Sequence, residues 1–214
     1  METNTVMRSR MADFLYCGAG GNKGFFLMGM GFTTLDENTN AQAEKRPYIS
    51  DKVASTIIRG YETQFPFATD IMTKQPVIEL LYTISRNQLR GGDAETDYVR
   101  VEAFYETGQP NVHPARKFRV AVEVTDITGE GTQHMEMTGN LNPVGDFVPG
   151  AFDIATNTFY AGSVDANNML TVTVKGQTIL LRDGLFAGNA AGQGFGSFGM
   201  APDPINDGGK DKGK

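Results

Sequence analysis

Few side chains in this sequence have the chemistry to hold a metal ion. The chain contains two histidines, His113 and His134, and neither has a Cys or a second His near it in sequence, which disfavours a zinc site. Asp93, Glu95 and Asp97 alternate after two glycines, and spaced carboxylates can bind calcium. A calcium loop also needs a glycine at its sixth position and a distant glutamate, and neither is in register here. The sequence therefore predicts no metal site.

Patterns for cofactor binding and for nucleophilic catalysis are equally weak. The segment "GFGSFG" (194–199) has the G-x-G-x-x-G spacing of a dinucleotide-binding loop, which precedes a helix. The prolines of "APDP" (201–204) follow it and exclude that helix. The single cysteine, Cys17, cannot form an internal disulfide, and no G-x-S-x-G motif is present. We predict no catalytic residue and no cofactor, and we expect a structural protein, not an enzyme.

The net charge of −6 lies in the middle of the chain. Residues 1–46 hold five basic and five acidic groups, residues 187–214 hold three of each, and 47–186 hold 11 basic and 17 acidic groups. An acidic body is not typical of a protein that binds nucleic acid tightly. No apolar stretch reaches the length of a membrane span, so we expect a chain that stays in the cytoplasm.

One amphipathic helix is predicted at 76–88. Its apolar residues recur at the spacing of a single helix face: Val77, Leu80, Leu81 and Ile84. Pro76 suits the first turn, because the N–H that proline lacks would have no partner there. Gly91 is expected to take the left-handed position that ends the helix.

Period-two alternation predicts strands through the rest of the body. The expected strands are 25–30, 98–105, 117–126 and 133–140, with "MLTVTVKG" (169–176) and "TILLRD" (178–183) forming a pair around Gly176. Apolar residues alternate with polar ones, among them Glu102, Glu123 and Glu136, and one polar face per strand is typical of antiparallel sheet. We predict a mainly β fold, a two-sheet antiparallel sandwich flanked by one α-helix.

Segments 1–24, 36–52 and 187–214 lack a clear pattern of apolar residues. We expect 1–24 to be an extended N-terminal arm, 25–186 to be the β-sandwich domain, and 187–214, with its eight glycines, to be a flexible C-terminal extension. Within the domain, 36–52 is polar and without periodicity. It is predicted to be a long loop that orders only on contact with a neighbouring subunit.

The segment "GNLNPVGDFVPGAFD" (139–153) lies between two predicted strands. Its glycines and prolines suit abrupt turns, and Phe147 and Phe152 can fix those turns to a surface. It contains no His, Cys, Ser or Lys. We interpret it as a connection that shapes the subunit and has no reaction to perform.

Whole segments of the chain resemble a known family. They are "GYETQFPFATDIM" (60–72), "ELLYTISRNQLRGGDAETDYVRVEAF" (79–104) and "PARKFRVAVEVTDITGEGTQHMEMTGNLNPVGDFVPGAFD" (114–153). In this order they are similar to the major tail tube proteins of long-tailed bacteriophages that infect Gram-positive bacteria, and of their prophages. The resemblance extends from about Phe25 to Phe159.

The resemblance implies a sandwich of two antiparallel sheets flanked by a helix, with six subunits in a ring. Rings stack into a tube through which the genome leaves, and the N-terminal segment, the long early loop and the C-terminal extension join ring to ring. The implied partners are further copies of the chain, the tape measure protein, the tail terminator and the distal tail or baseplate proteins. The implied location is the tail of the virion, after assembly in the host cytoplasm, with no membrane involved. The candidate subunit contacts are Asp36, Glu44, Arg46, Tyr48, Phe147 and Phe152.

The resemblance also implies a lumen that DNA crosses without specific binding. DNA carries about one negative charge per 1.7 Å of its axis, so a basic wall would hold it back. We therefore expect an acidic wall, and the candidates to line it are Glu102, Glu123 and Glu136. The alternative is that these carboxylates face the outer solvent or pair with Arg100 and Arg119.

Other functions stay open at this stage. The tube of a phage-tail-like bacteriocin or of a contractile tail would share the fold. A β-sandwich binding module, such as a carbohydrate-binding domain, would need exposed Trp or clustered Tyr on one face, and the chain has no Trp. A small metal-dependent enzyme is disfavoured by the two isolated histidines.

Overall fold

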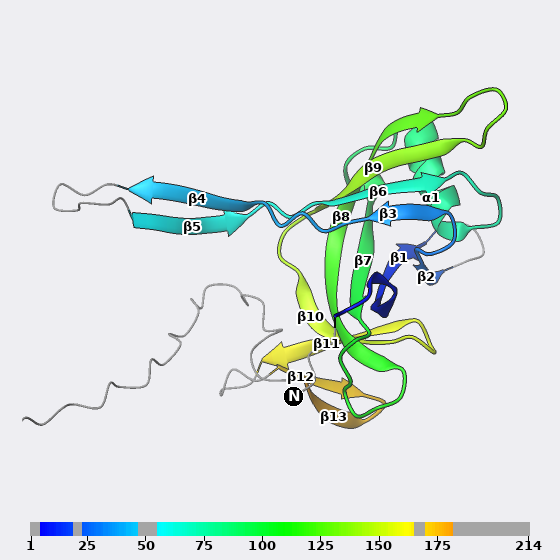
Figure 1. Ribbon diagram of the computed structural model, residues 1–214. Helices are drawn as coiled ribbons and strands as arrows, with labels where there is room; N and C mark the ends of the chain where they lie inside the picture. The colour runs from blue at the N-terminus through cyan, green and yellow to red at the C-terminus, as the bar shows by residue number, and fades with distance from the viewer. Residues whose placement is uncertain (1–4, 19–22, 47–54, 165–169, 182–214) are drawn as a thin grey trace, which may run out of the picture.

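The computed structural model describes residues 5–18, 23–46, 55–164 and 170–181. Over these residues the protein is mainly β, with one α-helix, α1 (Pro76–Arg86), against a curled antiparallel sheet (Figure 1). A small second sheet stands apart from it. The predicted fold class is thereby confirmed. The predicted C-terminal extension, 187–214, lies outside the described residues.

The strands follow one another along the chain with short 3₁₀ turns at Arg8–Arg10 and Gly91–Ala94. Their bounds are β1 (Met11–Cys17), β2 (Gly24–Leu27), β3 (Phe32–Leu35), β4 (Ala41–Arg46), β5 (Ser55–Tyr61), β6 (Phe65–Asp70), β7 (Glu95–Glu102), β8 (Val112–Thr128), β9 (Glu136–Pro143), β10 (Val148–Asp153), β11 (Thr158–Val164), β12 (Leu170–Val174) and β13 (Gln177–Leu181).

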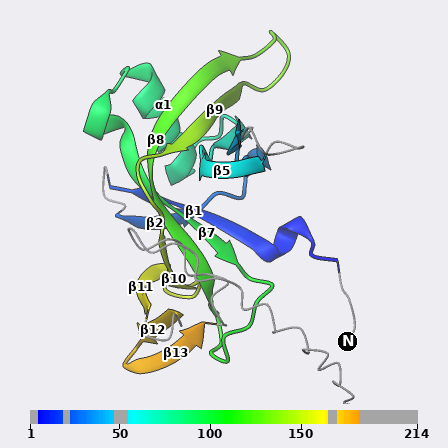
Figure 2. The same ribbon diagram turned by 90° about the vertical axis from the view of Figure 1, so that its left-hand side faces the viewer.

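The long strand β8 organises the main sheet. This eleven-stranded sheet has the order β13-β12-β11-β10-β8-β7-β1-β2, and β9, β6 and β3 branch from β8. The first half of β8 pairs with β10, while its second half pairs with β9 beyond the point where β10 leaves it. Because β8 belongs to both parts, the sheet curls. Strand β9 lies toward one end of β8, and β10 to β13 lie toward its other end (Figure 2).

The alternation predicted for 117–126 is confirmed in β8. Phe118, Val120 and Val122 are buried, whereas Arg119 and Glu123 are exposed. The buried side chains join the main apolar cluster, which the buried face of α1 covers. The helix therefore covers the core on one face of the sheet, because its apolar stripe is buried by packing on that face.

The predicted helix is confirmed, and its C-terminal end is corrected. It ends at Arg86, two residues before the predicted end at 88. Gly91 is left-handed as predicted, with φ 56°, but it begins the 3₁₀ turn Gly91–Ala94 and does not end the helix. Gln88, with φ 49°, takes the left-handed position after the helix, and the Leu89 N–H donates to the Ile84 carbonyl over 3.1 Å. That hydrogen bond satisfies a carbonyl of the last turn, so the helix stops before Gly91 is reached.

Two predicted strands are displaced by three residues. The strand expected at 98–105 runs over Glu95–Glu102, and the strand expected at 133–140 runs over Glu136–Pro143. Met137 is buried, as the alternation predicts, but Met135 lies outside β9 and is half-exposed. The strand pair around Gly176 is confirmed as β12 and β13, which Lys175 and Gly176 connect with positive φ at both positions.

The prediction of an N-terminal arm over 1–24 is wrong for β1. This strand lies inside the main sheet, between β2 and β7, and Phe14, Leu15 and Cys17 are buried. Asp13 interrupts the apolar run of β1, so the sequence pattern did not indicate a strand there. The partner of that aspartate lies on β7, far away in sequence.

The prediction of an irregular loop over 36–52 is wrong for β4. Ala41–Arg46 pairs with Ser55–Tyr61 as a two-stranded antiparallel hairpin, with a bulge between Gln42 and Ala43. The hairpin projects far from the body (Figure 1), so β4 buries neither face and shows no apolar alternation. Tyr48 lies outside the described residues. Dependence of the hairpin on a neighbouring subunit stays a prediction.

The connection 139–153 consists largely of strand, and only one of its glycines turns the chain. Gly145 has φ 82° between β9 and β10. Gly139 lies within β9, where a Cβ atom would come within 2.1 Å of the Glu123 carbonyl oxygen. Gly150 lies within β10, where a Cβ atom would come within 2.2 Å of the Tyr160 carbonyl oxygen. These two glycines allow close approach of neighbouring backbones instead of the abrupt turns that were predicted.

Candidate functional site

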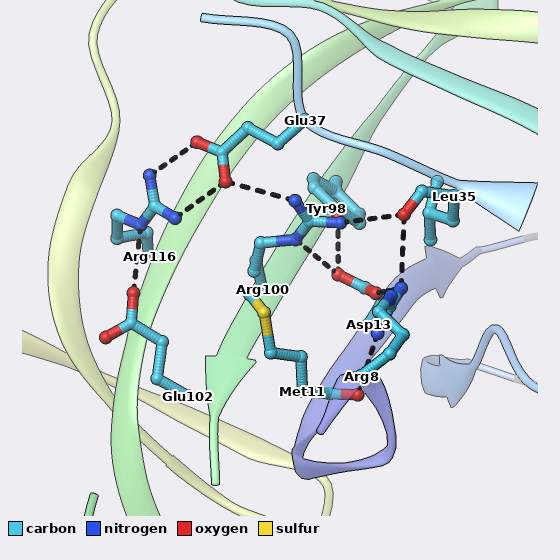
Figure 3. A network of polar contacts seen from close by, with 9 residues as sticks. All are labelled: Arg8, Met11, Asp13, Leu35, Glu37, Tyr98, Arg100, Glu102 and Arg116. Carbon is cyan, nitrogen blue, oxygen red and sulfur yellow. Dashed lines mark hydrogen bonds and ion pairs between the residues drawn. The ribbon is translucent and has the colours of Figure 1, made fainter. Parts of the chain in front are cut away.

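A network of charged side chains, buried or half-buried except for Arg8, holds the segment that leads from β3 to β4 (Figure 3). Its members come from the chain before β1, from β1, β7 and β8, and from the segment between β3 and β4. They are Arg8, Asp13, Glu37, Tyr98, Arg100, Glu102 and Arg116. Three arginines and three carboxylates make the formal charge of the network zero.

The strand register brings the network together. Asp13 on β1 lies opposite Arg100 on β7, and Arg100 lies opposite Arg116 on β8. Two arginines directly opposite each other repel, so this ladder needs a further carboxylate. Glu37 supplies it from the segment that leads into the hairpin.

Asp13 is the deepest member, and its carboxylate is 1% exposed. It accepts hydrogen bonds from Arg100 Nε over 2.8 Å, from Tyr98 Oη over 2.5 Å and from Arg8 Nη2 over 2.5 Å. Burial, together with the Asp13 charge, raises the pKa of Tyr98 well above its ordinary value, so this hydroxyl stays a donor. The carboxylate is thus compensated inside the protein, as a buried charge must be.

Glu37 joins the two arginines. It accepts a two-pronged hydrogen bond from Arg116, over 2.8 and 2.9 Å, and a further one from Arg100 Nη1 over 3.0 Å. Burial acts to raise its pKa, but the hydrogen bonds and charges of the arginines outweigh burial and hold the pKa below its ordinary value. Arg100 also donates to the Leu35 carbonyl over 3.2 Å. The end of β3 and the start of the hairpin segment are therefore fixed to the main sheet.

Glu102 is the weakly held member. Its Oε1 lies 3.5 Å from Arg116 Nε, a buried nitrogen that has no hydrogen-bond partner among the described residues. Burial raises the pKa of Glu102 above its ordinary value, although Arg116 acts in the opposite direction. This residue was expected on the exposed face of a strand, and it is 9% exposed instead. The alternation of β7 misleads because both faces of this central strand are covered.

The other two candidates for a lumen wall are exposed. Glu123 lies on β8, where its carboxylate accepts a hydrogen bond from Asn142 over 2.8 Å. Glu136 lies at the start of β9. Whether either residue faces a lumen stays a prediction.

The candidate subunit contacts divide into two groups. Asp36 is exposed, and Glu44 forms an ion pair with Arg59 across the hairpin. Arg46 is the last residue of β4. These residues lie on or beside the hairpin, where the prediction of a subunit contact stays open.

The two phenylalanines of the 139–153 connection pack within the chain. Phe152 is fully buried, with its ring centroid 4.4 Å from that of Phe14, so its assignment as a subunit contact is wrong. Phe147 is half-buried, and its ring lies 5.4 Å from that of Phe118. Phe147 thus fixes the turn between β9 and β10 to the subunit's own core, whereas Phe152 lies within β10 and fixes no turn.

The hairpin that the network anchors carries exposed apolar side chains. Ile57 and Ile58 are each 48% exposed, and Tyr61 is 65% exposed. Successive residues of a strand point to opposite faces, so Ile57 and Ile58 place apolar surface on both faces of the hairpin. The network thus binds the segment before the hairpin to the main sheet, and the hairpin exposes apolar side chains.

Sequence reasoning missed the network, although β1 contained a signal for it. Asp13 is the one charged residue within the apolar run "MADFLYC" (11–17). A carboxylate inside a strand with buried neighbours requires a cation, and that requirement predicts a partner without naming it. Chemically, the arginines and carboxylates neutralise one another, so the arrangement is suited to holding elements in place.

No family model and no curated protein matches the sequence. Among solved structures, a chain from the "Cryo-EM structure of the anti-feeding prophage (AFP) baseplate, 6-fold symmetrised" is similar, with a TM-score of 0.42 and 12% identity, over 70% of this chain and 97% of that chain. A likeness at this level supports no statement about function. Within the described residues, no helix is long and apolar enough to cross a membrane.

Proposed function

We propose that this chain is a structural, non-catalytic subunit of a bacteriophage tail tube. Six copies form a ring, and stacked rings form the conduit through which the genome leaves the virion. The tape measure protein, the tail terminator and the distal tail or baseplate proteins are its partners, and assembly takes place in the host cytoplasm. The proposal starts from the resemblance of three ordered segments to major tail tube proteins.

The observation that carries the proposal is the projecting β4–β5 hairpin. A two-stranded hairpin is marginally stable in water by itself, because neither strand buries a face. This hairpin, which projects from the body (Figure 1), nevertheless exposes Ile57, Ile58 and Tyr61. Exposed apolar surface of this kind marks a protein contact, and in a stacked tube that contact is a neighbouring subunit.

The buried network supports the same function mechanically. A projecting element that carries load between subunits needs a base that does not shift. Glu37 fixes the start of the hairpin segment to Arg100 and Arg116, and paired backbone hydrogen bonds of 2.9 Å between Asn38 and Gln64 hold the next turn. The hairpin is thus joined to the sheet at its root, and the exposed apolar side chains of β5 are left for a partner.

The test compares assembly of the full chain with that of a hairpin variant. In Ile57→Asp/Ile58→Asp, both exposed faces of β5 become charged. We expect wild-type protein to form rings or tubes in negative-stain micrographs, and we expect the variant to stay small by light scattering. Tyr82→Asp is the matched control, because Tyr82 is 37% exposed on α1, on a different surface. This control should assemble normally.

Two outcomes would contradict the reasoning in different ways. If wild-type protein stays monomeric at all concentrations and salts, even with tail tips to seed growth, the tail-tube function is wrong and a binding module becomes the better interpretation. If wild-type protein and the hairpin variant assemble equally well, the tube function stands but the hairpin does not join subunits.

A further inference from the structure

A second polar cluster lies at the other end of β6 from the network's hairpin segment, where β6 ends and β9 begins. It consists of Asp70, His134 and Glu136. The His134 Nε2 atom lies 3.2 Å from Asp70 Oδ1 and 3.4 Å from Glu136 Oε1. Across the described residues, this is the one group of three or more such side chains whose ligand atoms converge within 4.8 Å.

The backbone fixes the two carboxylates opposite each other. Asp70 and Glu136 are direct partners in the antiparallel pairing of β6 with β9. The Ile71 N–H donates to the Met135 carbonyl over 2.8 Å, which continues the pairing one step beyond them. His134 then enters from the turn between β8 and β9. The three ligand groups therefore come from two chain segments that hydrogen bonds already hold side by side.

The electrostatics of the pair call for a cation. Two carboxylates directly opposite on one face of an antiparallel pair repel and destabilise the pairing. No Lys or Arg forms an ion pair with either carboxylate among the described residues, and both carboxylates contact the His134 imidazole. Two carboxylates with a neutral imidazole carry a charge of −2, which a divalent cation cancels.

The distances also fit a coordination sphere. Zinc binds nitrogen and carboxylate oxygen at about 2.0–2.2 Å, so neighbouring ligand atoms of a tetrahedral site lie roughly 3.3–3.6 Å apart. The two measured separations from His134 Nε2, 3.2 and 3.4 Å, are close to that edge. The side chains of His134 and Glu136 are 62% and 57% exposed, so they can adjust to bring the Asp70 and Glu136 oxygens to a similar separation. An imidazole among the ligands favours a transition-metal ion over calcium or magnesium.

We propose that Asp70, His134 and Glu136 form a binding site for a divalent transition-metal ion of the zinc type, with water in the remaining coordination positions. The ion joins the turn 129–135 to the end of β6. Its role is to stabilise the end of the β6–β9 pair, where the repelling carboxylates otherwise weaken the sheet. The site does not depend on the proposed tail-tube function.

The experiment is a calorimetric zinc titration of the full, unassembled chain at pH 7.5, after treatment with chelator. We expect one zinc ion per chain and a rise in the midpoint of thermal unfolding that chelator reverses. His134→Ala, Asp70→Asn and Glu136→Gln should each weaken zinc binding by about tenfold or more and abolish the rise. Each change is at a partly exposed position, and circular dichroism checks that each variant is folded.

His113→Gln is the matched control. His113 is the other histidine of the chain, and its Nδ1 lies 2.9 Å from the Tyr105 carbonyl oxygen on a different part of the sheet. This variant should bind zinc as the wild type does. Absence of stoichiometric binding to the wild type would overturn the proposal. Equal binding to wild type and His134→Ala would also overturn it, because zinc would then be an adventitious ion on the acidic surface only.

Discussion

Replacing Arg100 by methionine tests whether the buried network holds the fold together. The Arg100 side chain is 3% exposed and donates to Asp13, to Glu37 and to the Leu35 carbonyl. Methionine fills a similar volume but leaves the Asp13 carboxylate, which is 1% exposed, without its strongest partner. Removing one partner of a buried ion pair typically costs about 3–5 kcal/mol. Tyr98 and Arg8 still donate to Asp13, so we expect a loss near the lower end, about 3 kcal/mol.

Arg119→Met is the matched control, because it removes an arginine from the neighbouring strand. Arg119 is 47% exposed, with contacts of 3.2 Å to Glu95 and 3.3 Å to Asp97. Exposed ion pairs contribute roughly 0.2–1 kcal/mol, because water screens them. Equilibrium urea unfolding of dilute, unassembled protein at pH 7 measures both free energies of unfolding. The reasoning is refuted if Arg100→Met loses no more stability than Arg119→Met.

A double variant separates the lost ion pair from lost packing. In Asp13→Asn/Arg100→Met no buried charge is left unpaired at this end of the network, because Arg8 is 53% exposed and stays hydrated, and the Asn side-chain oxygen can accept from Tyr98. We expect this variant to be more stable than Arg100→Met alone, since replacing both members of a buried pair costs less than removing one. A double variant less stable than the single one would show that packing of the Arg100 side chain dominates.

Three further expectations concern single residues. Because burial raises the pKa of Glu102, the folded protein binds the carboxyl proton more tightly than the unfolded chain does. Ionised Glu102 therefore destabilises the fold, and this effect grows as pH rises from the pKa of the unfolded chain through the higher pKa of the folded protein. Urea unfolding should therefore find Glu102→Gln more stable than wild type at pH 7, with the difference gone below about pH 4. Cys17 is 3% exposed, and burial raises its pKa to about 11, so a thiol reagent at pH 8 should react only after unfolding. A reaction at the same rate in folded protein would contradict this burial. Gly139→Ala should lose roughly 1–3 kcal/mol, because its Cβ would lie 2.1 Å from a backbone oxygen. Gly131→Ala, with nothing within 4 Å, should stay within about 0.5 kcal/mol of wild type in the same unfolding assay.

The parts of the fold that bury one face could be predicted from the sequence. In β8, Phe118, Val120 and Val122 alternate with exposed residues, and in α1 the apolar spacing matches the face that packs on the sheet. Such patterns are local consequences of burial, so a single sequence contains them. The strand β4 buries neither face, and its pairing with β5 depends on backbone hydrogen bonds that leave no pattern in the side chains.

The candidate site could not be predicted, because its charges come from distant positions. Asp13 and Arg100 are 87 residues apart in sequence, and Glu37 and Arg116 are 79 apart. Each charge taken separately resembles an ordinary exposed residue of an alternating strand, as Glu102 did. Only the register of β1, β7 and β8 turns them into a neutral cluster, and register is a property of the folded sheet.

The same register dependence gives the network a specific role. A core of apolar side chains alone tolerates several pairings of β1 with β7, because one Val or Leu replaces another at little cost. A slip of one residue would place Asp13 opposite Val99 or Val101 and leave a buried carboxylate without its arginine. Arg100 and Arg116 in turn lie face to face only when Glu37 is in place between them. The network therefore couples two features of the fold. One is the register of β1, β7 and β8, and the other is the place where the β4–β5 hairpin leaves the main sheet. We expect variants that neutralise it to lose uniqueness of the hairpin's position before they lose the β-sheet itself.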